Sequence, residues 1–461
     1  MEGPELTRFI TGPIIQFEAP QGFQVVVARA TSTEGDGRAI VGIYTRNGRT
    51  TEAIPGFAHM SEHAFANASA TTREGDFPEG STSLDSNAQA RPDYVSAWLT
   101  VNRPDGSDAA PRALALRMSA KIWGAQIDTE LLEEQRQRVV DELGRGLSSG
   151  RFLSERALEY TFFGNRPSMA DEIHLMAEFD QDDILDYLAM VYRPSELVLV
   201  VAGDIDVPSM VTFLQESFER RGEILATERM PNPELFRPAE VIQDPGIVHR
   251  ESDTAEGDWV VAGFTTPPPD SEDYLALLVL DQHLMGGRDG FEELWTIRRS
   301  MNSPLGQRLS ASGPLDYLGD GRGYGAASPP LAEASPAYFT IQFGADEMDL
   351  TEGVTRLQTA LTDISQSEMN DADILASRDA LLGFYRLWLN AENLRPPSDH
   401  LAGLAFYHRE GASRLGNLAE DLVNVTPDDV RRVFDQYVIN APIRFATFEG
   451  ITPVVEPETA P

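Results

Sequence analysis

Residues 56–65 read Gly-Phe-Ala-His-Met-Ser-Glu-His-Ala-Phe and carry the pattern that decides the fold. We expect a helix here. Residues four apart on a helix share a face, so His59 and His63 can present their imidazoles to one metal ion. Glu62 follows His59 by three residues, which places its carboxylate beside the same face.

Two neutral imidazoles suit zinc, which in catalytic sites leaves a coordination position for water. The Glu62 carboxylate can take the proton of a water molecule that attacks a peptide carbonyl. The order His-x-x-Glu-His is that of the inverted zinc peptidases. The sequence therefore predicts one zinc ion per chain, held by His59 and His63, with Glu62 as general base. The alternative is a surface helix that carries these side chains by chance.

A zinc site of this kind needs a third protein ligand on a separate element. The helix expected over residues 129–147 offers Glu142, which is flanked by apolar residues. An acidic side chain at the apolar border of a helix is costly unless it is paired or metal-bound. We therefore predict Glu142 as the ligand. Asp141 and Glu134 are rivals on spacing alone, although solvated helix charges explain both.

Length and composition indicate a folded protein of two domains. The 461 residues exceed what one hydrophobic core usually organises. The chain has no cysteine, which excludes disulfides, thiolate zinc sites and cysteine nucleophiles. Lys121 is the only lysine, a bias that we attribute to composition and not to a site. No apolar run approaches the roughly 18 residues of a membrane span, so membrane insertion is not expected.

The charge balance is strongly acidic. There are 73 acidic and 37 basic side chains, for a formal net charge of −36. This field repels nucleic-acid phosphates and anionic lipids, so neither is expected as a partner. It would favour cationic peptides, but solubility or adaptation to salt explains it more simply. Met1 directly before Glu2 is what a chain trimmed of a signal peptide would look like, which favours a periplasmic location over a cytoplasmic one.

One order of elements occurs twice along the chain. The strand expected at residues 40–45 is echoed at residues 260–265, and a histidine, His63 or His283, follows nineteen residues after the aromatic residue of each. The proline-rich, aperiodic stretch 226–245 predicts a linker. We therefore expect an N-terminal zinc-bearing domain at 1–225 and a homologous C-terminal domain at 246–461. Further elements are expected as strands at 23–28 and 197–202 and as helices at 112–123, 182–192 and 208–220.

The second copy has lost the chemistry of the first. With equal spacing, Val279 stands in place of His59 and Gln282 in place of Glu62, so His283 remains alone. A lone histidine beside Leu284 is better explained as structural than as a metal ligand. The C-terminal domain is therefore expected to be inactive.

Residues 56–65 resemble the ligand helix of the pitrilysin and mitochondrial processing peptidase (M16) family of inverted zinc peptidases, most of all its short bacterial, M16B-like members. Residues 136–143 resemble the third-ligand helix of that family and map its ligand onto Glu142. Asn87 and Ala88 are similar to the strand that borders the family's substrate cleft. The segment from Tyr192 through 197–204 resembles the closing strand of the first domain.

The resemblance implies an α+β fold with two duplicated domains of the LuxS and processing-peptidase (MPP) type. Each is expected to be an antiparallel sheet packed against helices, and together they form a clamshell. Its chamber would admit peptides or unfolded segments, which add as a strand to a sheet edge. Arg322 and Tyr324 resemble an arginine and a tyrosine from the second domain of the family enzymes that contact substrate. They lie one residue closer together than in the family.

Gln135 stands where family enzymes often carry a supporting glutamate. An amide can still hydrogen-bond to a metal ligand but contributes no charge, which lowers the expected activity unless Glu134 substitutes after a shift in register. The leading hypothesis is a zinc-dependent metalloendopeptidase that acts on peptides. The alternative is a non-catalytic or half-site subunit of a heterodimer. The chain is expected to act as a homodimer or as a heterodimer with a related subunit.

Overall fold

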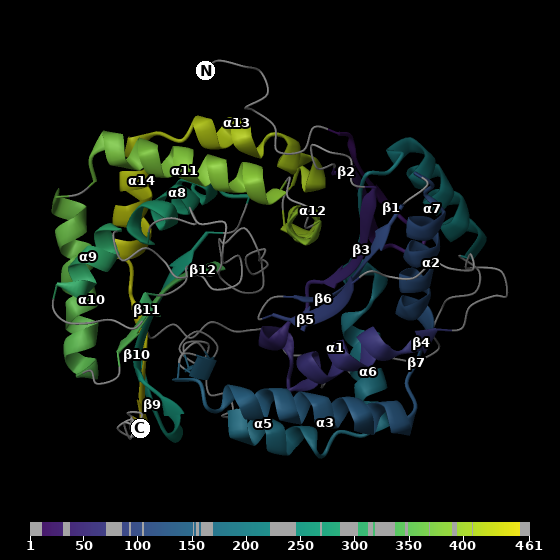
Figure 1. Ribbon diagram of the computed structural model, residues 1–461, viewed down its shortest axis with the longest axis horizontal. Helices are drawn as coiled ribbons and strands as arrows, with labels where there is room; N and C mark the ends of the chain where they lie inside the picture. Colours follow the sequence, from purple (N-terminus) through teal and green to yellow (C-terminus); the bar gives the residue numbers. More distant parts are fainter. Residues whose placement is uncertain are drawn as a thin grey trace, which may run out of the picture.

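The architecture is known from a computed structural model, which describes residues 12–30, 37–70, 85–91, 94–103, 106–150, 152–153, 156–157, 169–221, 246–267, 270–285, 303–311, 317–318, 337–345, 349–367, 369–389, 394–407 and 409–451. Within these ranges the chain forms two large sheets, one in each half, and each of them is packed against helices (Figure 1). The halves form the two sides of a clamshell, as the fold prediction required.

The first sheet has six strands in the order β1-β2-β8-β3-β6-β5. The pairs are antiparallel except β2 with β8, which is parallel. β5 pairs with β6 and lies at the edge of the sheet. The bounds are β1 (Ile14–Glu18), β2 (Gln24–Arg29), β3 (Arg38–Thr45), β5 (Asp85–Ala90), β6 (Val95–Asn102) and β8 (Leu197–Gly203).

The second sheet repeats this topology. Its order is β9-β13-β10-β12-β11, and its single parallel pair, β9 with β13, corresponds to β2 with β8. The predicted duplication is confirmed at the level of strand order. The expectation of purely antiparallel sheets needs correction, because one parallel pair occurs in each. The bounds are β9 (Ile247–Glu256), β10 (Asp258–Thr266), β11 (Tyr317–Leu318), β12 (Ala337–Ala345) and β13 (Arg444–Ile451).

Helices cover one face of the first sheet. Alternate residues of a strand point to opposite faces, and Val25 and Val27 of β2 belong to the core beneath these helices. The bounds of five of these helices lie within three residues of those expected from the sequence, and α5 was not expected. They are α1 (Phe57–Asn67), α2 (Ala109–Gly124), α3 (Thr129–Gly146), α5 (Met169–Met176), α6 (Gln181–Val191) and α7 (Val207–Arg221), with a short ribbon of β4 (Ser69–Ala70) and β7 (Ala125–Gln126).

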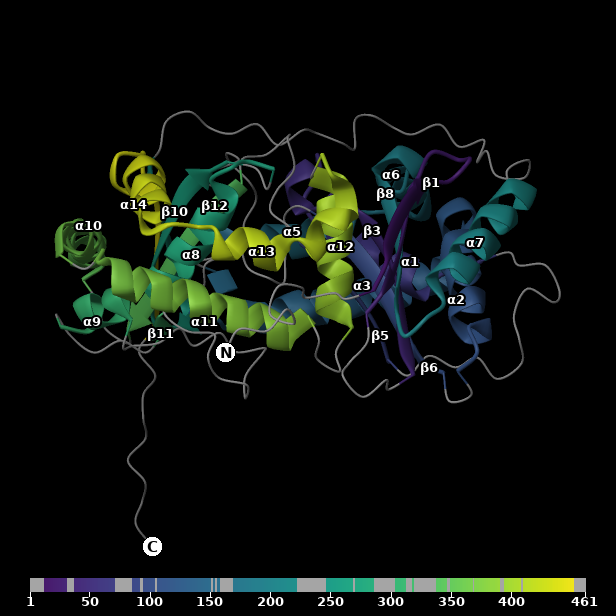
Figure 2. The same cartoon turned by 90° about the horizontal axis from the view of Figure 1, so that it is seen from above.

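The opposite face of the first sheet is covered by the second half of the chain. Val26 and Ala28 belong to a core shared with the second sheet and its helices. Figures 1 and 2 show α11 and α13 leading from the second half to α12, which packs on β2, β3 and β8. The bounds are α8 (Tyr274–Met285), α9 (Pro304–Ser310), α10 (Leu350–Ser367), α11 (Asp371–Leu389), α12 (Arg395–Tyr407), α13 (Leu418–Val423) and α14 (Pro427–Phe434).

The structure bears on the separation of the two halves but not on the predicted linker between them. The linker at 226–245 lies outside the described residues, so the boundaries at 1–225 and 246–461 stay predictions. The two halves do not have separate hydrophobic cores, because α12 from the second half packs on the open face of the first sheet. Among the described residues, no helix is long and apolar enough to cross a membrane.

Candidate metal centre

The ligand helix α1 begins at a glycine for a steric reason. Gly56 has φ +101°, and a Cβ at this position would lie 2.8 Å from Cγ of Met176. A side chain here would be strained both by the left-handed backbone and by that contact. In the first turn of α1, Glu52 Oε2 accepts a hydrogen bond of 2.7 Å from the Ala58 backbone N–H. A buried carboxylate at a helix N-terminus satisfies a free donor and complements the helix dipole.

Aromatic packing fixes the rotation of α1 about its axis. The ring of Phe57 stacks on Phe179 at 4.0 Å and lies 5.2 Å from Tyr187. Two turns later, Phe65 stacks on Tyr192 at 4.2 Å. With these rings buried against α6 and its neighbours, the remaining face of the helix is turned toward the cavity described below.

The C-terminus of α1 is held by Lys121, from α2. Its Nζ donates to the backbone oxygens of Ala66 at 2.7 Å and Phe65 at 3.3 Å. A cation here satisfies end carbonyls and complements the negative end of the helix dipole. Burial lowers the pKa of Lys121 to about 8, and nearby Arg117 adds to this. From the sequence, Lys121 was attributed to composition alone, and a single lysine among 37 basic side chains is the signal that could have marked it.

Three predicted metal ligands converge on one point. Glu142 Oε2 on α3 lies 3.5 Å from His63 Nε2 and 3.8 Å from His59 Nε2. The ligand atoms of His59, Glu62 and His63 all lie within 4.8 Å of one another. The helical spacing of four and the crossing of α1 with α3 produce this cluster, as predicted from the sequence.

The donor set fits a zinc ion. Bonds of 2.0–2.1 Å in a tetrahedral site place donor atoms about 3.4 Å apart, close to the separations between Glu142 and the two imidazoles. The two histidine side chains are mostly buried, at 12% and 17% exposure, whereas Glu142 is half exposed. The cluster therefore opens on one side, as a site that admits water and substrate must.

The rivals of Glu142 point elsewhere. Glu134 forms an ion pair with Arg138, and Asp141 accepts a hydrogen bond of 2.7 Å from Gln137. Both side chains are exposed on α3. The register shift that would bring Glu134 to the site is therefore absent.

The electrostatics of the cluster separate its two carboxylates. Hydrogen bonds from His59 and His63 hold the pKa of Glu142 well below its usual range, which keeps it ionised. Burial opposes protonation of His63, but the hydrogen bond to Glu142 and the charges of Glu62 and Glu142 outweigh burial and raise its pKa. Burial raises the pKa of Glu62, although the histidines oppose this. A carboxyl with a raised pKa is a better proton acceptor, as a general base requires.

Gln135 supports the cluster from behind. It is 1% exposed, its side chain hydrogen-bonds His63, and its Oε1 accepts from Asn67 Nδ2 at 3.1 Å. The other hydrogen bond of Asn67 Nδ2 goes to the His63 backbone oxygen at 2.8 Å. An acceptor behind an imidazole fixes its ring orientation, so Gln135 is placed for the supporting role that the sequence predicted.

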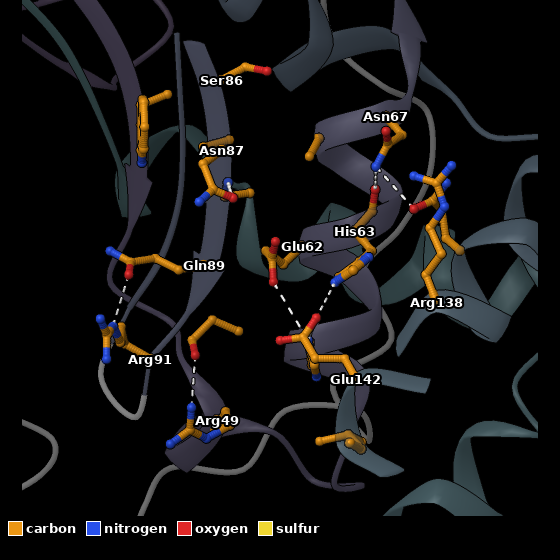
Figure 3. A pocket seen from close by; sticks show the side chains of 18 of the residues that line it. Arg49, Glu62, His63, Asn67, Ser86, Asn87, Gln89, Arg91, Arg138 and Glu142 are labelled. Carbon is orange, nitrogen blue, oxygen red and sulfur yellow. Dashed lines mark hydrogen bonds and ion pairs between the residues drawn. The ribbon is translucent and has the colours of Figure 1, made fainter. Parts of the chain in front are cut away.

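A cavity of about 910 Å³ lies in front of the cluster. Figure 3 shows Glu62, His63 and Glu142 on one side of it and β5, with Asn87 and Gln89, on the other. Asn87 and Ala88, the predicted substrate contacts, line the cavity, and Asn87 Oδ1 accepts from the Ala88 N–H at 2.9 Å. Arg322 and Tyr324 lie outside the described residues.

The corresponding helix of the second half, α8, is built differently. Every residue from Ala276 to Met285 is buried, and His283 Nδ1 lies 3.2 Å from Ser377 Oγ. Val279 and Gln282, which correspond to His59 and Glu62 by equal spacing in the sequence, are both buried. This helix presents no metal-binding face, in keeping with the structural role expected for His283.

Comparison with known proteins agrees with the fold. A protease from Helicobacter pylori aligns with a TM-score of 0.70 at 14% identity, over 95% of this chain and 100% of its own. The peptidase M16 inactive domain from Pseudomonas fluorescens gives 0.70 at 13% identity, over 96% and 99%. A putative M16-like peptidase from Alicyclobacillus acidocaldarius gives 0.67 at 13% identity, over 98% and 99%. This chain has the fold of M16-like peptidases.

The sequence match is more restricted than the M16 fold. Residues 178–381 match the family described as Peptidase M16 inactive domain. This segment runs from the end of the first half into α11, so His59, Glu62, His63 and Glu142 all lie outside it. No curated protein matches the chain in sequence. The roles of the site residues and membership of the M16B subgroup stay predictions.

Proposed function

We propose that this protein is a zinc-dependent metallopeptidase that hydrolyses peptide bonds within the cavity in front of α1. The convergence of His59, His63 and Glu142 beside the buried carboxylate of Glu62 carries the proposal. His59, His63 and Glu142 would hold the ion. When bound, zinc supplies Lewis-acid chemistry, polarising the carbonyl and lowering the pKa of water.

The chain's own residues account for the remaining requirements. Glu62 lies beside His59, with 3.9 Å between its Oε2 and Nε2, and accepts a proton from the attacking water. The outer edge of β5 offers backbone groups to which a peptide can add as a strand. Gln135 holds the ring of His63 in position, as an amide that adds no charge.

A second candidate function is a non-catalytic or half-site subunit that binds peptides for a related partner. The match of residues 178–381 to an inactive domain, and the inactive-domain relative from Pseudomonas fluorescens, favour it. The presence of all four site residues argues against this role, because a subunit that had lost even one ligand would not hold the metal. Light scattering after size-exclusion chromatography distinguishes a homodimer from a monomer that requires a related partner.

The deciding experiment measures zinc and cleavage together. Purified protein is supplied with zinc, its metal content is determined by elemental analysis, and cleavage of an unstructured peptide is followed by mass spectrometry. We expect one zinc per chain, cleavage by the wild type and none by Glu62→Gln, which keeps the metal. Glu134→Gln, on the solvent side of α3, is the matched control and should cleave normally. Zinc binding without cleavage would favour the subunit role, and absence of zinc would overturn both the cofactor and the peptidase.

A further inference from the structure

The lining of the cavity reverses the charge balance of the chain. Acidic side chains outnumber basic ones by 73 to 37 overall. Around the cavity the described residues contribute three carboxylates and six cations, a formal excess of three positive charges. The carboxylates are Glu62, Glu142 and Glu172, and the cations are Arg49, Arg91, Arg117, Lys121, Arg138 and Arg156.

The carboxylates of the lining are already engaged. Glu142 faces the two histidines, and Glu62 is buried beside them. Glu172 is 1% exposed and forms an ion pair with Arg156. Glu62 and Glu172 are therefore buried away from the mouth of the cavity, and the charge of the half-exposed Glu142 would be offset by the metal ion that it is proposed to hold.

The cations stand at both ends of the ligand helix. Arg49 and Arg91 lie together beside the end of β5, where Arg49 Nη1 donates to the Ala90 oxygen at 2.8 Å (Figure 3). Lys121 holds the other end of α1, and Arg117 lies one turn away from it on α2. Arg117 is exposed and makes no ion pair with the described residues.

Of the two other cations, Arg156 is paired with Glu172, whereas Arg138 belongs to α3 and is drawn in Figure 3 on the opposite side of the view from Arg49 and Arg91. It is 57% exposed, and its partner Glu134 is 54% exposed, so their pairing is weak and can yield to a substrate carboxylate.

We infer that the cavity selects acidic peptides, with carboxylate side chains on both sides of the bond that faces Glu62. The inference rests on the proposed peptidase function and names its substrate class. An eleven-residue helix is about 16 Å long, which an extended peptide spans with about five residues. The cations therefore meet side chains about two or three residues from the central bond on each side.

The acidity of the rest of the molecule does not cancel this preference. At about 0.15 M salt the screening length is about 8 Å, so distant surface carboxylates contribute little inside the cavity. The expectation that a general acidic field favours cationic peptides applies outside the cavity, and the local charges act against it. One exposed ion pair typically changes an equilibrium by about two- to threefold, so two or three together give about tenfold.

The test separates binding from catalysis. Three labelled peptides of one sequence carry Glu, Gln or Lys two and three residues from the centre on both sides, and their binding to zinc-loaded full-length Glu62→Gln protein is followed by fluorescence anisotropy. We expect the Glu peptide to bind about tenfold more tightly than the Gln peptide, and the Lys peptide most weakly. Adding Arg117→Gln and Arg138→Gln should reduce the preference to about threefold or less. Both side chains are exposed, so circular dichroism should show an unchanged fold.

The matched control is Arg220→Gln, on α7 and away from the cavity, where Arg220 Nε donates to the Glu216 oxygen at 3.0 Å. It should leave the preference unchanged. Equal binding of the three peptides, or tighter binding of the Lys peptide, would overturn the inference even if the wild type cleaves all of them. Preference for the Glu peptide without cleavage by wild type would uphold the charge selection and overturn the peptidase.

Discussion

Tyr44 on β3 donates a hydrogen bond of 2.8 Å to Asp399 Oδ1 on α12, across 355 residues of sequence. Ser398 Oγ lies 2.8 Å from the same hydroxyl, and all three side chains are buried. Burial and the neighbouring Asp399 raise the pKa of Tyr44, so its hydroxyl stays protonated as a donor. This contact joins the two halves at β3, the strand that leads to α1.

Replacing Tyr44 with Phe should lower the free energy of unfolding by about 1–3 kcal/mol, because a buried hydrogen bond to a carboxylate is lost. Urea denaturation followed by circular dichroism measures the change. Tyr192→Phe is the matched control: its hydroxyl is equally buried but has no hydrogen-bond partner among the described residues, so its removal should cost little. Equal losses from both variants would mean that the contact between the halves contributes nothing specific.

Removing the predicted third ligand should abolish tight zinc binding. In Glu142→Gln an ionised donor becomes a neutral amide, and we expect zinc affinity to fall by about 100-fold or more. Competition titration with a chromophoric chelator gives the affinity. Asp141→Gln changes the adjacent exposed carboxylate and should bind zinc as the wild type does. If Asp141→Gln lost zinc and Glu142→Gln kept it, the assignment of the ligand would be wrong.

Gln135, behind His63, allows a test in both directions. Gln135→Leu removes the hydrogen bonds to His63 and Asn67 and should weaken zinc binding by about 10- to 100-fold. Gln135→Glu supplies a charged acceptor, which makes the imidazole a stronger ligand, and should strengthen binding. Zinc affinity that is the same in wild type and both variants would show that Gln135 only fills space.

Lys121 gives a pH dependence whose sign follows from its burial. Its pKa is lowered to about 8 in the folded chain, against about 10.5 when unfolded. Below pH 8 the amine is charged in both states, and the cost of burying the charge is fully present. Between pH 8 and 10.5 the folded state loses its proton first, so this cost is relieved by about 3 kcal/mol as the pH rises.

The wild type should therefore gain stability relative to Lys121→Met across that pH range, as measured by denaturant unfolding at several pH values. Because this is the only lysine, labelling lysine with ¹³C gives a single side-chain signal whose titration reports the pKa directly. A midpoint near 10.5, or a stability difference that does not change with pH, would contradict the prediction.

The sequence by itself determined the elements and the reactive cluster. Hydrophobic periodicity placed α1, α3 and β8 to within two residues, because local spacing and burial decide them. The distance of four between His59 and His63 fixed their common face. The repeated order of strands predicted the two related sheets, although the parallel pair in each was not visible in local sequence.

Only the tertiary structure decided which distant residues meet. The crossing of α1 and α3 distinguished Glu142 from Glu134 and Asp141, since all three have the same local chemistry. Burial of Lys121 beneath the end of α1 and the cationic lining of the cavity depend on side chains brought together from separate elements. The closure of the first sheet by α12 likewise depends on contacts more than 350 residues apart, which no local pattern encodes.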